Sequence, residues 1–134
     1  MSESSNADTI YGVHNTIAEY AHALDDGRAD DVAALFCIDG ISDISAVGRY
    51  EGREEIRAGY ARLAPTSPQR HLVSNVVVTP LGTGEARASS DFLFLARGDA
   101  GWAAVVAGHY DDDLHLDEAD GRWRFHRRAT SYVM

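Results

Sequence analysis

The chain divides into a helical half and a strand-rich half, and this division constrains the fold more than any other feature. Apolar residues such as Ile10, Val13 and Ile17 recur at helical spacing. Beyond residue 70 the chain consists of long apolar runs separated by turns such as Asp120-Gly121. We expect helices at 8–24, 29–36 and 53–63, and strands at 40–47, 70–79, 86–97, 102–116 and 123–133, with a short strand between Gly48 and Gly52. Helices followed by an antiparallel meander predict an α+β fold, with three N-terminal helices packed on one face of a curved, mostly antiparallel sheet.

The length of 134 residues and a hydrophobic share of 45% suit one domain, 1–134, with one core. Residues 1–7 are expected to form a disordered lead-in, and Asp8 is expected to cap the first helix. The N-terminus lacks the basic and apolar regions of a signal peptide. No stretch is apolar enough to span a membrane, so the expected location is the cytoplasm, with no membrane partner.

Charge and composition exclude several classes of function. The net charge of −9 repels phosphate, so nucleic acid is not an expected partner. All 12 basic residues are arginine, and the absence of lysine excludes Schiff-base chemistry and hints at a GC-rich bacterial genome. Cys37 is the only cysteine and no compact metal-ligand spacing is present. We therefore expect neither a metal nor a cofactor.

Four residues on separate predicted elements have the side chains that proton transfer near neutral pH requires: Tyr20, Asp25, His71 and His109. Asp25 ends the first predicted helix, where the helix dipole disfavours an anion, so a partner such as a histidinium would stabilise it. The alternatives are structural: Asp25 as a loop carboxylate, Tyr20 as a core residue and His71 as a structural histidine. Counting along the strands leaves open whether His71 and His109 share a face, because bulges are common in such sheets.

Five segments carry a family resemblance: YAHALDDGRAD at 20–30, LFCIDG at 35–40, GRYEGREEI at 48–56, GHYD at 108–111 and GRWRFHR at 121–127. Together they resemble the SnoaL-like family, whose superfamily includes ketosteroid isomerase, scytalone dehydratase, limonene epoxide hydrolase and nuclear transport factor two. The resemblance implies a cone-shaped α+β barrel. It also implies that His71 is a dehydratase general acid and base, that Asp25 supports it, and that His109 is the second dehydratase histidine. Tyr20 resembles the tyrosine of bile-acid dehydratases and the oxyanion tyrosine of ketosteroid isomerase.

This resemblance predicts a lyase or isomerase that needs no cofactor and acts on a cyclic, apolar carbonyl compound such as a polyketide or steroid-like ring. His71 would remove a proton α to the carbonyl, and Tyr20 would donate a hydrogen bond to the enolate oxygen. Dehydration, isomerisation and cyclisation all remain open. The residues expected to line the substrate cavity are Phe36, Asn75, Phe92, Phe94 and Trp123, with core packing as the alternative.

A second hypothesis comes from a different class of protein. The segment 102–107 is apolar on both faces of its predicted strand, as an oligomer interface would require. The chain could therefore be a small-molecule binding protein or a partner subunit of an oxygenase-type complex. A homodimer explains the same segment equally well, and we expect one.

Overall fold

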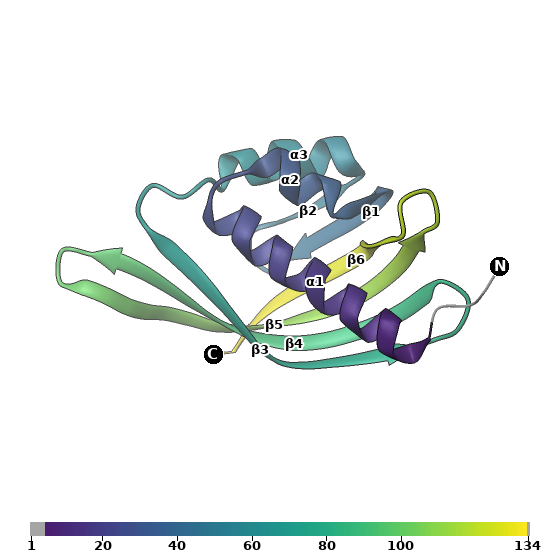
Figure 1. Ribbon diagram of the computed structural model, residues 1–134. Coiled ribbons are helices and arrows are strands. Elements are labelled where there is room, and N and C mark those ends of the chain that lie inside the picture. The colour runs from purple at the N-terminus through teal and green to yellow at the C-terminus, as the bar shows by residue number, and fades with distance from the viewer. Residues whose placement is uncertain (1–4, 134) are drawn as a thin grey trace.

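The computed structural model describes residues 5–133, in which three helices lie against one face of a curved sheet (Figure 1). The elements are α1 (Asn6–Asp25), α2 (Ala29–Ala34), β1 (Phe36–Ile44), β2 (Gly48–Glu51), α3 (Arg53–Arg62), β3 (Gln69–Pro80), β4 (Glu85–Gly98), β5 (Gly101–Asp117) and β6 (Arg122–Val133). The α+β prediction is confirmed, and the helices and long strands lie close to their predicted ranges.

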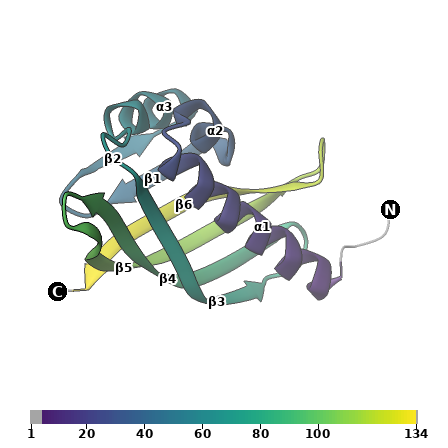
Figure 2. The same cartoon turned by 60° about the vertical axis from the view of Figure 1, so that its left-hand side comes forward.

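The sheet has the strand order β2-β1-β6-β5-β4-β3. Neighbouring strands are antiparallel except for β1 and β6, which are parallel. Figure 2 shows α1 crossing the concave side of the sheet, while the hairpin between β4 and β5 extends beyond the helices in Figure 1. The sheet is curved and open, and its concave face, which α1 covers, is called the inner face here.

The first helix begins earlier than the sequence predicted. Ser5 is the N-cap, and its side chain accepts a hydrogen bond from the backbone N–H of Asp8, which lies inside the first turn. The prediction of Asp8 as the cap is therefore wrong. Residues 5–7 of the predicted lead-in belong to the cap and first turn, and residues 1–4 lie outside the described part of the chain.

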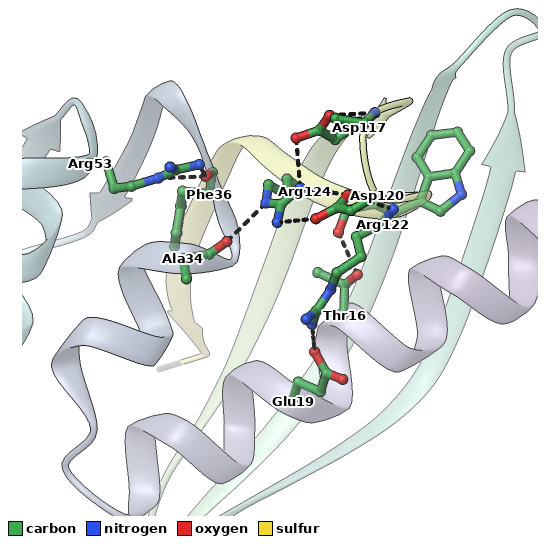
Figure 3. A network of polar contacts seen from close by, with 11 residues as sticks. Thr16, Glu19, Ala34, Phe36, Arg53, Asp117, Asp120, Arg122 and Arg124 are labelled. Carbon is green, nitrogen blue, oxygen red and sulfur yellow. Dashed lines mark hydrogen bonds and ion pairs between the residues drawn. The ribbon is translucent and has the colours of Figure 1, made fainter.

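The junction between α2 and β1 also differs from the prediction, because α2 ends at Ala34 and β1 begins at Phe36. Arginine side chains satisfy the carbonyl groups there: Arg124 donates to the Ala34 carbonyl at 3.0 Å and Arg53 to the Phe36 carbonyl at 2.7 Å (Figure 3). These bonds end the helix before Phe36, which pairs with Phe125 of β6. Arg124 also binds Asp117 and Asp120, so this network ties the β5–β6 hairpin to the helices.

The core lies between the helices and the inner face. Its centre is a cluster of aromatic side chains from five elements, in which the ring of Tyr20 meets those of Phe36, Tyr60, Tyr110 and Phe125 edge to face or nearly so. Among residues 5–133, no helix is long and apolar enough to cross a membrane.

Candidate functional site

A cavity of about 560 Å³ lies between the helices and the inner face of the sheet, next to the aromatic cluster. This volume falls within the range of small-molecule sites. Most of its wall is apolar, and the structure places Phe92 and Phe94 in it, where the sequence predicted them. Other apolar wall residues are Leu24, Ile44, Leu63, Val106 and Tyr132. We call this space the central cavity.

Asp25 and His71 form a hydrogen-bonded pair at the edge of the central cavity. The backbone N–H of His71 donates to Oδ2 of Asp25 at 2.7 Å, and Nδ1 of His71 lies 2.6 Å from Oδ1. Gln69 donates a third hydrogen bond, from Nε2 to Oδ1, at 3.2 Å. The side chains of His71 and Asp25 are 12% and 5% exposed, so the pair is largely shielded from water. The C-terminus of α1 and the start of β3 are thereby joined.

The pair has a defined protonation pattern. Burial alone would raise the pKa of Asp25, but the hydrogen bonds from the side chain and backbone of His71 outweigh burial and lower that pKa below its ordinary value. An ionised Asp25 can only accept, so Nδ1 of His71 carries a proton and donates it. In neutral His71 the basic lone pair is then on Nε2, which has no hydrogen-bond partner among residues 5–133. A nitrogen in this state can act as a general base.

Tyr20 also lines the central cavity and is 2% exposed. Its hydroxyl lies 2.6 Å from that of Tyr60, which in turn lies 2.7 Å from Oγ of Ser42. Burial raises the pKa of Tyr20 well above its usual range, so its hydroxyl stays protonated near neutral pH. If Tyr60 donates to Tyr20, the proton of Tyr20 is free for a ligand. Two of the four predicted catalytic residues, Tyr20 and His71, thus line one cavity, and a third, Asp25, is hydrogen-bonded to His71 at its edge.

A buried ion pair lies behind the tyrosines. Nε of Arg128 donates to Oδ1 of Asp112 at 3.0 Å, and both side chains are 0% exposed. The guanidinium carbon lies 3.5 Å from the centre of the Tyr110 ring and 4.2 Å from that of Tyr20. Burial raises the pKa of Asp112 to about 6, although Arg128 opposes this rise. The pair is therefore ionised at neutral pH and places a cation against the rings of the site.

His109 does not belong to this cavity, so its predicted place in the site is wrong. On β5 its neighbours Gly108 and Tyr110 face the helices, and successive strand residues point to opposite faces. Nδ1 of His109 lies 2.8 Å from Asp91 and Nε2 lies 3.2 Å from Asp111, both on the outer, convex face. The hydrogen bond with Asp91 is the main cause that raises the pKa of His109. The histidine belongs to an exposed polar cluster.

Three predicted wall residues also lie elsewhere. Asn75 has a left-handed backbone (φ 55°) at a bulge in β3 and binds Asp91 on the outer face. Trp123 is buried against Gly12 of α1, away from the central cavity. Phe36 is completely buried in the aromatic core and does not line the cavity. For Trp123 and Phe36 the alternative of core packing holds, whereas Asn75 lies on the exposed outer face.

Sequence reasoning missed several polar residues of the site: Gln69, Tyr60, Tyr110 and the pair Asp112–Arg128. The signal that could have identified Tyr110 is its alternation with His109, because only one of two neighbouring strand residues can face the helices. Nothing in the sequence marked Arg128 as buried within its arginine-rich strand. Among residues 5–133, no group of three or more His, Cys, Asp or Glu side chains could hold a metal ion.

Comparison with known proteins agrees with this architecture. The model of the SnoaL-like domain family matches residues 6–129. No curated protein matches the chain.

Solved structures with the same fold include proteins of different kinds. Three of them come from Novosphingobium aromaticivorans. One is a candidate scytalone dehydratase, with 22% identity, 96% of this chain and 87% of that chain covered, and a TM-score of 0.83. Another is a nuclear-transport-factor-two-like protein with a cystatin-like fold, with 20% identity, coverage of 92% and 80%, and a TM-score of 0.82. The third is the β subunit of a candidate aromatic-ring-hydroxylating dioxygenase, with 20% identity, coverage of 97% and 93%, and a TM-score of 0.83.

At these identities the structural likeness shows the fold alone. The family model, in contrast, covers nearly the whole chain. This protein belongs to the SnoaL-like family.

Proposed function

We propose that the protein is an acid–base lyase or isomerase that needs no cofactor and acts on a cyclic, largely apolar carbonyl compound such as a polyketide or steroid-like ring. One observation carries the proposal: His71, which is hydrogen-bonded to the shielded Asp25, lines an apolar cavity large enough for such a ring. A carboxylate that orients a histidine is a recurrent arrangement for general-base catalysis.

The chemistry follows from the state of each group. Nε2 of His71 takes the proton from the carbon next to the carbonyl, and the electrons of that C–H bond move toward the carbonyl oxygen to form an enolate. Tyr20, accepting from Tyr60, donates a hydrogen bond to this oxygen. Asp25 stabilises the imidazolium.

The fate of the enolate decides the product. In a dehydration, the enolate electrons expel a hydroxyl group from the β carbon, and the imidazolium returns the proton to it, so that water leaves. In an isomerisation, the proton returns to a different carbon. In a cyclisation, the enolate carbon attacks a second carbonyl carbon. All three use the same base and the same oxygen donor.

The test uses β-hydroxytetralone, a fused-ring ketone that becomes a naphthol when it loses water, with product formation followed by absorbance. The wild type is expected to accelerate water loss, and His71→Ala is expected to lose about 10²- to 10⁴-fold of that acceleration while still binding the ketone. His109→Ala is the matched control, because this histidine lies on the outer face, and it should retain the wild-type rate. Equal rates in wild type and His71→Ala would contradict the proposal.

An apolar row on the outer face favours a second candidate function. In this case the protein binds a small molecule without reaction, or is a partner subunit of an oxygenase-type complex. Leu72 pairs with Leu93, Leu93 with Ala107, and Ala107 with Val133, and all four are exposed. Leu72 and Val133 are 55% and 64% exposed, which is unusual for apolar residues that lie together. A homodimer through this face is part of the same proposal.

Light scattering tests this second candidate. If the row is an interface between copies, the wild type has the mass of a dimer, and Leu93→Glu shifts it toward the monomer without changing its circular dichroism. A monomeric wild type would exclude the homodimer. A ligand that binds saturably and is recovered unchanged would favour the binding function over catalysis.

A further inference from the structure

Tyr110 lies in the wall of the central cavity, and the described part of the chain supplies no partner for its hydroxyl. The residue lines the central cavity and is 2% exposed, and its hydroxyl makes no hydrogen bond with any residue of 5–133. The neighbouring hydroxyls of Tyr20, Tyr60 and Ser42 are all linked to one another. The polar group of so deeply buried a side chain normally has a partner, so an unpaired donor on a cavity wall indicates a ligand group that would pair with it.

The ring of Tyr110 is held in place by its neighbours. It stacks on Phe92 with centroids 4.5 Å apart, and the guanidinium carbon of Arg128 lies 3.5 Å from its centre. It also meets the ring of Tyr20 edge to face at 5.9 Å. Gly108 makes the stacking possible, because a Cβ at that position would overlap the Phe92 ring. A donor fixed in this way loses little conformational entropy when a ligand binds.

Further unpaired polar atoms lie around Tyr110. Ser90 on β4 and Thr130 on β6 are its direct cross-strand partners, so the three residues form one row on the inner face. The side-chain oxygens of Ser90 and Thr130 and Nη1 of Arg128 are buried without a hydrogen-bond partner. Thr130 also lines the central cavity. Of this row, Tyr110 and Thr130 line the cavity, so polar groups interrupt the apolar wall where the row meets it.

We propose that Tyr110 donates a hydrogen bond to the carbonyl oxygen of the bound ring, as a second donor beside Tyr20, with Thr130 next to it. This assignment rests on the proposed function and narrows the substrate class. The substrate is a cyclic ketone whose oxygen faces β5 while its acidic C–H bond faces His71. Two fixed donors at one oxygen stabilise the enolate more than the ketone, which is what a rate-accelerating site requires.

Electrostatics agree with a donor role. Burial raises the pKa of Tyr110 well above its usual range, and the charge of Arg128 only partly opposes this rise. The hydroxyl is therefore protonated at neutral pH and has its proton available.

The experiment compares two probes that differ in a single oxygen: tetralone, labelled with carbon-13 at its carbonyl, and tetralin, which has no carbonyl. One net hydrogen bond corresponds to a preference for tetralone of about 2- to 12-fold in affinity. Tyr110→Phe should lower the wild-type preference by about this factor, because Tyr20 remains as a donor. It should leave the affinity for tetralin unchanged and move the bound carbonyl resonance toward its value for free tetralone. Tyr11→Phe, which removes an exposed hydroxyl from α1, is the matched control and should retain the wild-type values.

The assignment is overturned if Tyr110→Phe retains both the preference and the carbonyl shift. If that variant does not fold, fluorotyrosine at position 110 replaces it, because a more acidic hydroxyl should move the carbonyl resonance further from its free value. An unchanged resonance would then refute the assignment.

The rate of water loss from β-hydroxytetralone distinguishes failure of this inference from failure of the proposed function. A wild type that shows the Tyr110-dependent shift but no turnover contradicts the proposed function alone. Turnover that needs His71 but shows no Tyr110-dependent shift contradicts this inference alone.

Discussion

Asp25 accepts two hydrogen bonds from the single residue His71, one from its backbone N–H at 2.7 Å and one from its imidazole Nδ1 at 2.6 Å. The first bond fixes the position of the strand relative to α1, and the second fixes the ring on that strand. An aspartate at the end of a helix is electrostatically disfavoured there, and His71 compensates for it. A side chain that would otherwise destabilise the helix thereby orients the proposed base.

Replacing Asp25 by asparagine should reduce turnover more than binding. The amide retains the shape of the side chain but cannot stabilise an imidazolium by charge, so proton removal by His71 becomes harder. We expect kcat for β-hydroxytetralone to fall by about 10²-fold, with a much smaller change in KM. Steady-state kinetics at several pH values measure both, and an unchanged kcat would show that the carboxylate has no role in the reaction.

The lowered pKa of Asp25 predicts a pH dependence of stability. A carboxyl group with a lower pKa in the folded state stabilises the fold above its unfolded pKa, and this contribution is lost as the pH falls through the folded value. The free energy of unfolding of the wild type should therefore exceed that of Asp25→Asn near pH 7. The difference should shrink below the ordinary value of 3.8. Urea denaturation from pH 7 to pH 3 tests this, and a difference that stays constant would contradict the assigned protonation state.

Replacing Gly108 by alanine should damage the cavity wall. The added methyl group overlaps the Phe92 ring, which must then move away from Tyr110 and His71. We expect a loss of about 1–3 kcal/mol in the free energy of unfolding, together with weaker binding of tetralone. Gly98→Ala on the same sheet is the control, because nothing lies within 4 Å of a Cβ there. Equal stability of the two variants would contradict the close packing of Phe92.

The effects of replacing Arg128 and Asp112 on the free energy of unfolding should not add up. Arg128→Met leaves the Asp112 carboxylate buried without its partner, and we expect a loss of about 3–5 kcal/mol. Removing both charges in Arg128→Met/Asp112→Leu should restore part of that stability, because no unpaired charge remains. A double-mutant cycle by chemical denaturation measures the coupling between the two residues. A double variant that is less stable than Arg128→Met would contradict this.

The sequence predicted the elements of the fold well because their signals are local. Apolar spacing, turn residues and glycines placed the helices and the long strands within a few residues. The parallel pairing of β1 with β6 has no such signal, since it depends on contacts between residues far apart in the chain. The start of β1 at Phe36 was missed for the same reason, because Arg124 and Arg53, distant in sequence, satisfy the carbonyls there.

The site was predictable only in part. The family resemblance pointed to Tyr20 and His71, which line one cavity, and to Asp25, which is hydrogen-bonded to His71. It also pointed to His109, but strand alternation turns that residue outward and turns Tyr110 inward. Asn75 shows the limit of counting along a strand, because the bulge at its position directs it to the outer face. The burial of Arg128 and Asp112 could not be inferred, because charged residues are rarely buried and pairing is a property of the tertiary structure.

The most direct test of the acid–base account is exchange of the α-protons of tetralone in deuterated water, followed by proton NMR. This measurement needs neither the natural substrate nor a leaving group, since the base alone exchanges the C–H proton for deuterium. The account predicts that the wild type and His109→Ala accelerate exchange, and that His71→Ala reduces the rate to that of buffer. Exchange that is equally fast in His71→Ala, or no acceleration by a wild type that binds tetralone, would contradict the account.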